Sequence, residues 1–417
     1  MNMRKVLHLA SLALAGGAVL GFIGCGDNTS NSTGSAGQAG NGTGGQGGDP
    51  GSGGSAGQTA SSSSGSAGQG GGSVTNVPMF VAQGMVGRTI VSCDDGQSWV
   101  ANRSDDDAYP CFSDATHDCD HHPGAGRGIT FGAGYFVATF GWGKPGSIRR
   151  SRNGTDWANT LEGKTFAGIV YGNGKFLAGE RPPQVSSDDA TTWTPGGNPD
   201  SAVWNVRRTG FAPHAGGRFF LAFDSGSSDL NYSDDDGATW KRPTTLPAEC
   251  AASMQWEGGF AYGNGVALVL GGDGVACSSK DGGDTWTATN IGTTATDGRL
   301  IWDGSAFIAW GRSNNTPVRF SSSDGLTWNT TPTMVREKDA NGVVQTKPGP
   351  SIGAVARSDS GTYVAVNGGW QQWYDKQRFY RSTDGITWDT LDAGKYVGSH
   401  PIQFIAFGMG ERGGACP

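Results

Sequence analysis

A short pattern that ends in tryptophan recurs seven times along the chain and limits what the chain can fold into. Seven of the 14 Trp residues close a copy of it. The copies read SCDDGQSW, SRNGTDW, SSDDATTW, SDDDGATW, SKDGGDTW, SSDGLTW and STDGITW, starting at residues 92, 151, 186, 233, 279, 322 and 382. An Asp or Asn side chain in such a segment accepts hydrogen bonds from nearby backbone N–H groups, and Gly supplies a positive φ. The pattern predicts one tight turn, used seven times, with Trp packed over it. The turn-forming residues are Asp94, Asn153, Asp188, Asp235, Asp281, Asp324 and Asp384.

A second repeated segment precedes most of these turns. It is two short alternating runs around a glycine-containing turn, which is typical of a β-hairpin. Copies begin at Ile129, Ile169, Phe260 and Leu300, with looser ones at Phe211 and Ala354. One hairpin and one Trp turn make a four-stranded unit, and units of about 40 to 50 residues are propeller blades. The predicted fold class is therefore all-β, a seven-bladed β-propeller of four-stranded blades.

The two ends of the repeated region complement each other. Only MFVAQG, from Met79, precedes the first turn, so the innermost strand of that unit is missing. FIAFGMGER, from Phe404, is an innermost strand with no turn after it. We predict that N- and C-terminal strands share the last blade and close the ring, which removes open sheet edges. Residues 77–417 then form one domain.

The seven turns resemble the Asp box of sialidase-like, or BNR-repeat, proteins, whose pattern is S-x-D-x-G-x-T-W or one residue shorter. Two copies are degraded, with Asn153 in place of Asp and Ala190 in place of Gly. The resemblance covers residues 77–417 and implies Asp-box blades whose boxes are structural turns remote from any active site. It also implies what an enzyme of the family would need, namely an arginine triad, a Tyr–Glu pair and an Asp acid/base. The Arg-Ile-Pro motif of the family is absent, because the single arginine in residues 77–92 is Arg88 and Thr89 follows it.

The first 76 residues are predicted to contain a targeting signal followed by a tether. Arg4 and Lys5 precede an apolar run at residues 6–23, which is typical of a secretory signal. The run is slightly short for a spanning helix, the alternative reading. GFIGC at residues 21–25 resembles a bacterial lipobox, so residues 1–25 are predicted to be a lipoprotein signal peptide with Cys25 lipidated. Residues 26–73 hold no large apolar side chain, and we expect residues 26–76 to be a disordered Gly/Ser-rich tether. The expected location is the bacterial cell envelope, membrane-anchored and facing the periplasm or the exterior.

The net charge limits the classes of partner that the chain can bind, and the cysteine content predicts disulfide bonds. The net charge of −7 argues against nucleic acid, which is bound through Lys and Arg. Six cysteines remain after Cys25, and an exported chain favours disulfides. Fifteen pairings exist in principle, and position favours Cys111–Cys119, Cys250–Cys277 and Cys93–Cys416. The cluster of His117, His121 and His122 is interpreted as a solvated loop, with a metal site as the lesser alternative. We expect a monomer with no cofactor and no metal.

Candidate ligand-binding residues fall on loops of one face. In a four-stranded blade the one-to-two turns and the Asp boxes share one face, and the two-to-three and four-to-one loops share the other. Variable loops on a rigid scaffold commonly bind ligands. Acids, arginines and aromatics there suit a polar ligand such as a sugar, although a solvated rim is the alternative. The candidates are Trp142, Glu180, Arg181, Asp224, Asp273, Arg312, Trp370 and Trp373.

Catalysis is the second hypothesis. Arg127, Arg208 and Arg299 each precede an innermost strand and could converge as a triad, although one residue of slip reverses a strand side chain. Glu180 and Asp224 are conceivable carboxylates, but no pair at the spacing of a retaining glycosidase can be assigned. The sequence therefore predicts a surface-tethered, noncatalytic propeller that binds a glycan or a protein. The alternative is an exported, sialidase-like glycoside hydrolase.

Overall fold

The computed structural model describes residues 75–84, 87, 89–101, 125–141, 146–200, 206–223, 230–253, 259–271, 274–292, 300–367, 378–391, 402–413 and 416. The predicted signal peptide and almost all of the predicted tether therefore lie outside the described residues. So do several predicted site residues, namely Cys25, Cys111, Cys119, Trp142, Asp224, Asp273, Arg299, Trp370 and Trp373, together with His117, His121 and His122.

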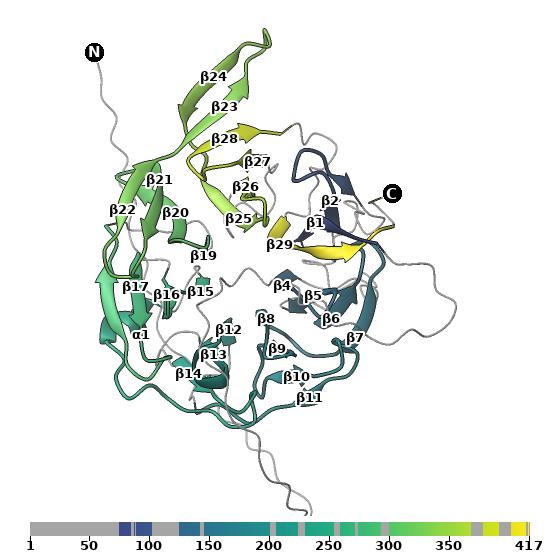
Figure 1. The fold of residues 1–417 in the computed structure, drawn as a ribbon, viewed down its shortest axis with the longest axis vertical. Coiled ribbons are helices and arrows are strands. Elements are labelled where there is room, and N and C mark those ends of the chain that lie inside the picture. The colour runs from purple at the N-terminus through teal and green to yellow at the C-terminus, as the bar shows by residue number, and fades with distance from the viewer. Residues whose placement is uncertain are drawn as a thin grey trace, which may run out of the picture. The chain divides into compact units, whose positions relative to one another are not determined.

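The described strands form seven sheets around one axis, and the four-stranded blades within them are antiparallel (Figure 1). The predicted fold class, a seven-bladed β-propeller, is confirmed. From the axis outward, the first three blades are β29 (Ile402–Glu411), β1 (Asn76–Gly84), β2 (Thr89–Ser92) and β3 (Val100–Ala101); β4 (Ala125–Gly132), β5 (Tyr135–Gly141), β6 (Ser147–Ser151) and β7 (Ala158–Glu162); and β8 (Ile169–Gly172), β9 (Lys175–Ala178), β10 (Gln184–Ser186) and β11 (Thr194–Pro195).

The fourth blade has three strands, and an isolated bridge between Tyr232 and Lys241 marks its outer edge. Its strands are β12 (Val206–Ala212), β13 (Arg218–Phe223) and β14 (Leu230–Ser233). The next two blades are β15 (Gly259–Gly263), β16 (Val266–Leu270), β17 (Val275–Ser279) and β18 (Thr287–Asn290); and β19 (Ile301–Trp302), β20 (Phe307–Ser313), β21 (Thr316–Ser322) and β22 (Asn329–Pro332). The seventh is β25 (Ile352–Arg357), β26 (Tyr363–Asn367), β27 (Phe379–Ser382) and β28 (Thr387–Thr390). A short α1 (Ala248–Ser253) and a 3-10 turn (His214–Gly216) complete the described elements.

Strands from both ends of the chain build the first blade, as predicted. β1 pairs antiparallel with β29 from Asn76 opposite Glu411 to Gln83 opposite Phe404. A disulfide joins Cys93 to Cys416, 323 residues later in the chain, beside this pairing. A second disulfide, Cys250–Cys277, ties α1 to β17. Both disulfides match the pairings expected from the sequence.

A projecting hairpin was not anticipated. β23 (Met334–Lys338) and β24 (Val344–Pro348) pair with each other, and β23 adds parallel to β28 at the outer edge of the seventh blade (Figure 1). The hairpin turns because the Asp339 carboxylate accepts backbone hydrogen bonds from Asn341 and Val343, both at 2.9 Å. The blade period concealed this insertion, because it carries no Trp turn.

The seven predicted turns, which we call Asp turns, share one hydrogen-bond pattern. In each, the Asp or Asn side chain accepts backbone N–H bonds from residues two to four positions on. Thr285 donates to Asp281 at 2.9 Å, and Thr327 donates to Asp324 at 2.8 Å. Asn153 makes the same bonds, from Thr155 at 3.0 Å and Asp156 at 2.9 Å. The Asp or Asn side chain therefore satisfies backbone N–H groups that cannot form hydrogen bonds between strands where the chain reverses.

Each Asp turn also contacts the preceding blade. The seven boundaries between neighbouring blades each carry at least one polar contact of this kind. They are Glu411 N to Arg152 O, Arg150 Nη1 to Asp189 O, Lys175 Nζ to Asp236 Oδ2, Arg218 Nη1 to Gly282 O, Asn264 Nδ2 to Ser323 O, Trp310 Nε1 to Gly385 O, and Arg381 Nη2 to Asp95 Oδ2. The turns thus stabilise the ring as well as their own hairpins.

The carboxylates of the Asp turns are expected to make the stability of the fold depend on pH in the acidic range. Burial acts to raise the pKa of Asp281, but hydrogen bonds from Thr285 and Ser279 outweigh it and lower the pKa to about 2. A carboxyl whose folded pKa lies below its unfolded value of about 3.9 stabilises the fold above that value and ceases to do so as the pH falls. We expect the melting temperature to drop between about pH 4 and pH 2. Asp281→Asn should melt a few degrees lower at pH 7 and lose less on acidification. Thermal scans from pH 7 to pH 2 test this, and equal slopes for both proteins would contradict it.

Candidate functional site

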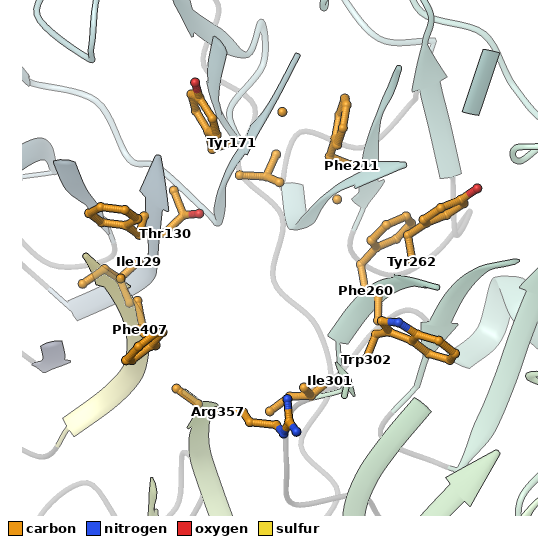
Figure 2. A pocket seen from close by; sticks show the side chains of 18 of the residues that line it. Ile129, Thr130, Tyr171, Phe211, Phe260, Tyr262, Ile301, Trp302, Arg357 and Phe407 are labelled. Carbon is orange, nitrogen blue, oxygen red and sulfur yellow. The ribbon is translucent and has the colours of Figure 1, made fainter. Parts of the chain in front are cut away.

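A cavity of about 700 Å³ lies on the axis of the propeller (Figure 2). All seven innermost strands, or the residues that immediately follow or precede them, contribute to its wall. The lining begins partway along these strands, at Ile129, Thr209, Val355 and Ile405. It ends with Asn173, Pro213 and Asp359 in one-to-two turns and with Met409 in β29. The cavity therefore occupies the end of the axis nearest the one-to-two turns.

The one-to-two turns and the Asp turns share a face, which we call the turn face. Asn173, in the one-to-two turn of the third blade, donates a hydrogen bond to Asp236, in an Asp turn, at 2.7 Å. The opposite side, which carries the two-to-three loops, is called the loop face. The described cavity thus lies toward the turn face, whereas the described candidate residues Glu180, Arg181 and Arg312 lie on the loop face.

Aromatic side chains at the ends of the innermost strands hold this wall in place. Figure 2 shows the rings of Tyr171, Phe211 and Trp302 extending away from the open centre, between blades. Each covers a glycine of the preceding blade so closely that a Cβ there would lie about 2 Å from the ring. The pairs are Phe131 on Gly408, Tyr171 on Gly132, Phe211 on Gly172, Phe260 on Gly210 and Trp302 on Gly263. The wall is therefore fixed by interlocked blades rather than by loops.

Few charged side chains line the described part of the cavity, namely Arg357 and Asp359. Arg357 stands where most other blades have an aromatic residue, and its guanidinium lies 5.5 Å from the Tyr363 ring. Its Nε atom is buried without a hydrogen-bond partner. Nearby, burial acts to raise the pKa of Asp303, but hydrogen bonds from Ala306 and Ser305, helped by Arg357, lower it overall. Asp303 is therefore close enough to Arg357 to offset part of its charge at this corner of the wall.

Glu180 and Arg181 lie in the two-to-three loop of the third blade, on the loop face and outside the cavity lining. The Glu180 carboxylate is 3.2 Å from Lys164 Nζ. Burial raises the pKa of Glu180, and Lys164 only partly opposes the effect. A raised carboxyl pKa suits an acid catalyst, but no second described carboxylate is brought beside Glu180.

Two of the three candidate arginines, Arg127 and Arg208, do not share one register. Arg127 sits at a bulge of β4, between Gly126 and Gly128 in the pairing with β5. Arg208 corresponds to Gly128, one residue later, and lines a small crevice with Phe220 and Phe260 between the fourth and fifth blades. Arg312 lies on the loop-face end of β20, where it donates to Ser351 Oγ at 2.6 Å. The structure therefore brings Arg127 and Arg208 into different environments, with Arg299 outside the described residues.

The sequence analysis missed the residues that line the cavity. The signal was present, because the innermost-strand copies end in Phe-Gly at 131–132, Tyr-Gly at 171–172 and 262–263, and Phe-Gly at 407–408. An aromatic residue followed by glycine at one register of a blade repeat indicates rings that pack on the neighbouring backbone.

Within the described ranges, no helix has the length and apolar character needed to cross a membrane.

Comparisons with known proteins bear on the fold only. The chain matches no sequence-family model and no curated protein. Among solved structures it is similar to "YCF48 bound to D1 peptide", at 14% identity over 70% of this chain and 90% of that one, with a TM-score of 0.45. It is also similar to YCF48 from Cyanidioschyzon merolae, at 14% identity over 64% and 85%, TM-score 0.43, and to a nidogen/laminin complex, at 12% over 61% and 92%, TM-score 0.39. Nothing about the ligand follows from likenesses this distant.

Proposed function

We propose that the protein is a noncatalytic binding propeller of the Asp-box type. In this proposal Cys25 carries the lipid, the residues between Cys25 and β1 form the tether, and the propeller takes a glycan or protein ligand at the cell envelope. The axial cavity carries the binding part of the proposal. Its volume of about 700 Å³ lies within the range of roughly 300 to 1,000 Å³ that is usual for ligand pockets.

The walls of the cavity suit binding better than hydrolysis. Most retaining glycosidases use two carboxylates about 5 Å apart, and a sialidase-like enzyme would instead use an arginine triad with a Tyr–Glu pair. Among the described lining residues Asp359 is the one acid, and Glu180 lies elsewhere. The interlocked rings and glycines hold the wall rigid, which lowers the entropy that a ligand loses on binding. We therefore place the ligand on the axis and give the loop-face residues Arg181 and Arg312 a peripheral role.

A substitution that fills the cavity should abolish binding. Thr130 and Ile301 border the open centre from different blades (Figure 2), and both are half-buried. We expect Thr130→Trp to weaken binding of any ligand recovered from a glycan array or a protein-interaction screen by about tenfold or more. Surface plasmon resonance on the folded variant measures the effect. Thr330→Trp adds the same bulk on the exposed outer strand β22 and is the matched control.

The same preparations separate binding from catalysis. A fluorogenic sialoside should remain intact with the wild-type protein. Ligand binding that survives both Thr130→Trp and Ile301→Trp would move the site away from the axis. Turnover of the sialoside that Glu180→Gln removes would instead favour the hydrolase.

A further inference from the structure

Among the described residues, no strand pairs with the inner edge of any of the seven innermost strands. β4, β8, β12, β15, β19, β25 and β29 each stand at the end of their sheet and pair with one neighbour in the described structure. Their other edge faces the axis, where they form the cavity wall (Figures 1 and 2). A strand edge offers a row of backbone N–H and C=O groups to another strand. The wall therefore supplies evenly spaced donors and acceptors that belong to the backbone.

The side chains between these backbone groups are mostly apolar. Ile129, Val170, Ile301, Val355 and Ile405 contribute to the wall. Two of the polar lining residues are already engaged, because Asn173 donates to Asp236 and Ser358 donates to Asp95 at 2.8 Å. A sugar needs side-chain donors and acceptors directed at its hydroxyl groups. This wall instead combines backbone polarity with apolar side chains, as a β-sheet edge does.

We propose that the axial cavity binds an extended, uncharged segment of a polypeptide, which adds as a strand to the inner edge of β29. The inference rests on the proposed function and names its ligand class. β29 is the longest innermost strand, and five consecutive residues, 405–409, line the cavity. Five residues of strand span about 17 Å. Backbone pairing supplies affinity in this mode, and alternate side chains of the segment contact the apolar wall.

Charge and geometry restrict the segment further. The described lining contains one base, Arg357, and one acid, Asp359, so it carries no net charge that would attract a Lys or a Glu of the ligand. Burying an unpaired ligand charge there would be costly. The rings that fix the wall extend between the blades and leave the centre open to main chain and small or apolar side chains. The favoured segment is therefore free of charged residues and adopts an extended conformation.

The test uses the full mature chain and a library of random hexapeptides made of L-amino acids. Peptides enriched on the wild-type protein are measured by calorimetry against the wild type, Thr130→Trp, Ile301→Trp and the control Thr330→Trp. We expect enriched peptides to be uncharged and to bind the wild type and Thr330→Trp alike. Both cavity variants should weaken binding at least about tenfold. Melting curves confirm that each variant is folded.

N-methylation then distinguishes strand pairing from apolar packing. In a strand, alternate N–H groups point to the same side, so only one set can meet the β29 edge. Methylating the odd or the even amides of one peptide should weaken binding about tenfold or more for one set and little for the other. Equal effects of both sets, enrichment of no peptide, or peptides that bind Thr130→Trp as well would overturn the proposal. A glycan whose binding is lost in Thr130→Trp would overturn it too, while leaving the axial cavity as the binding site.

Discussion

Removal of residues 402–417 is expected to leave the protein insoluble. The deletion takes away β29, which pairs with β1 over nine residue positions, and Cys416, the partner of Cys93. β1 carries the fully buried Met79, Phe80, Val81 and Ala82, and it would become an exposed apolar edge. Such edges pair with other chains and aggregate. The soluble fraction after expression and the size-exclusion profile measure the effect.

Two further proteins make this result specific to ring closure. Replacing residues 336–346 of the projecting hairpin by a short turn removes a similar length of chain, and we expect that protein to stay soluble and melt cooperatively. A synthetic peptide covering 402–413, added during refolding, should recover part of the soluble material. A truncated chain that is monomeric and melts in one sharp transition would show that the first blade does not need its innermost strand.

Substitution of Gly132 by alanine is expected to lower the melting temperature by about five degrees. A Cβ at this position would lie 2.2 Å from Cγ of Tyr171, in the next blade. The ring cannot retreat, because its other side packs on Phe176 with the ring centres 4.6 Å apart. Overpacking of this kind costs about 1–3 kcal/mol or more. Differential scanning calorimetry measures the shift.

A second substitution identifies the cause. Tyr171→Ala removes the ring and is destabilising alone, but combined with Gly132→Ala it should cost much less than the sum of the two changes. Gly134→Ala is the control, because nothing lies within 4 Å of its Cβ and only the positive φ of 79° opposes it. Additive effects of Gly132→Ala and Tyr171→Ala would show that the ring is not the obstacle.

The architecture was predictable because each level of the sequence points to the same blade. The Asp turns fix where strands three and four meet, the glycine turns fix strands one and two, and the half-blades at the two ends predict closure. The hairpin of β23 and β24 was not predicted, because its Asp339 turn has no Trp and adds strands beyond the repeat. The contacts between blades were not predicted either. The Lys175–Asp236 pair joins residues 61 positions apart, and no local pattern places them together.

The site was predictable only in outline. The sequence indicates an axial mouth with loops around it, but it does not show how far along the axis a cavity extends. The register of the strands is also not written in the sequence, and Arg208 lies between blades, one register from the position of Arg127. Strand bulges set such registers, and the bulge on β4 at Arg127 has no marker in the sequence. Residues that hold a wall through packing, as Tyr171 does on Gly132, are recognised only when two blades are seen together.

The pairing of β1 with β29 also sets an order of events. A chain is made from its N-terminus, so β1 is the first strand of the propeller to be made and its inner partner is the last. Until β29 is made, six blades and the edge of β1 lack the strand that closes the ring. Folding to the closed ring can therefore be completed only after β29 has been synthesised. Any pause or cleavage before residue 402 leaves a ring with a gap, so closure of the ring reports that the whole propeller has been made.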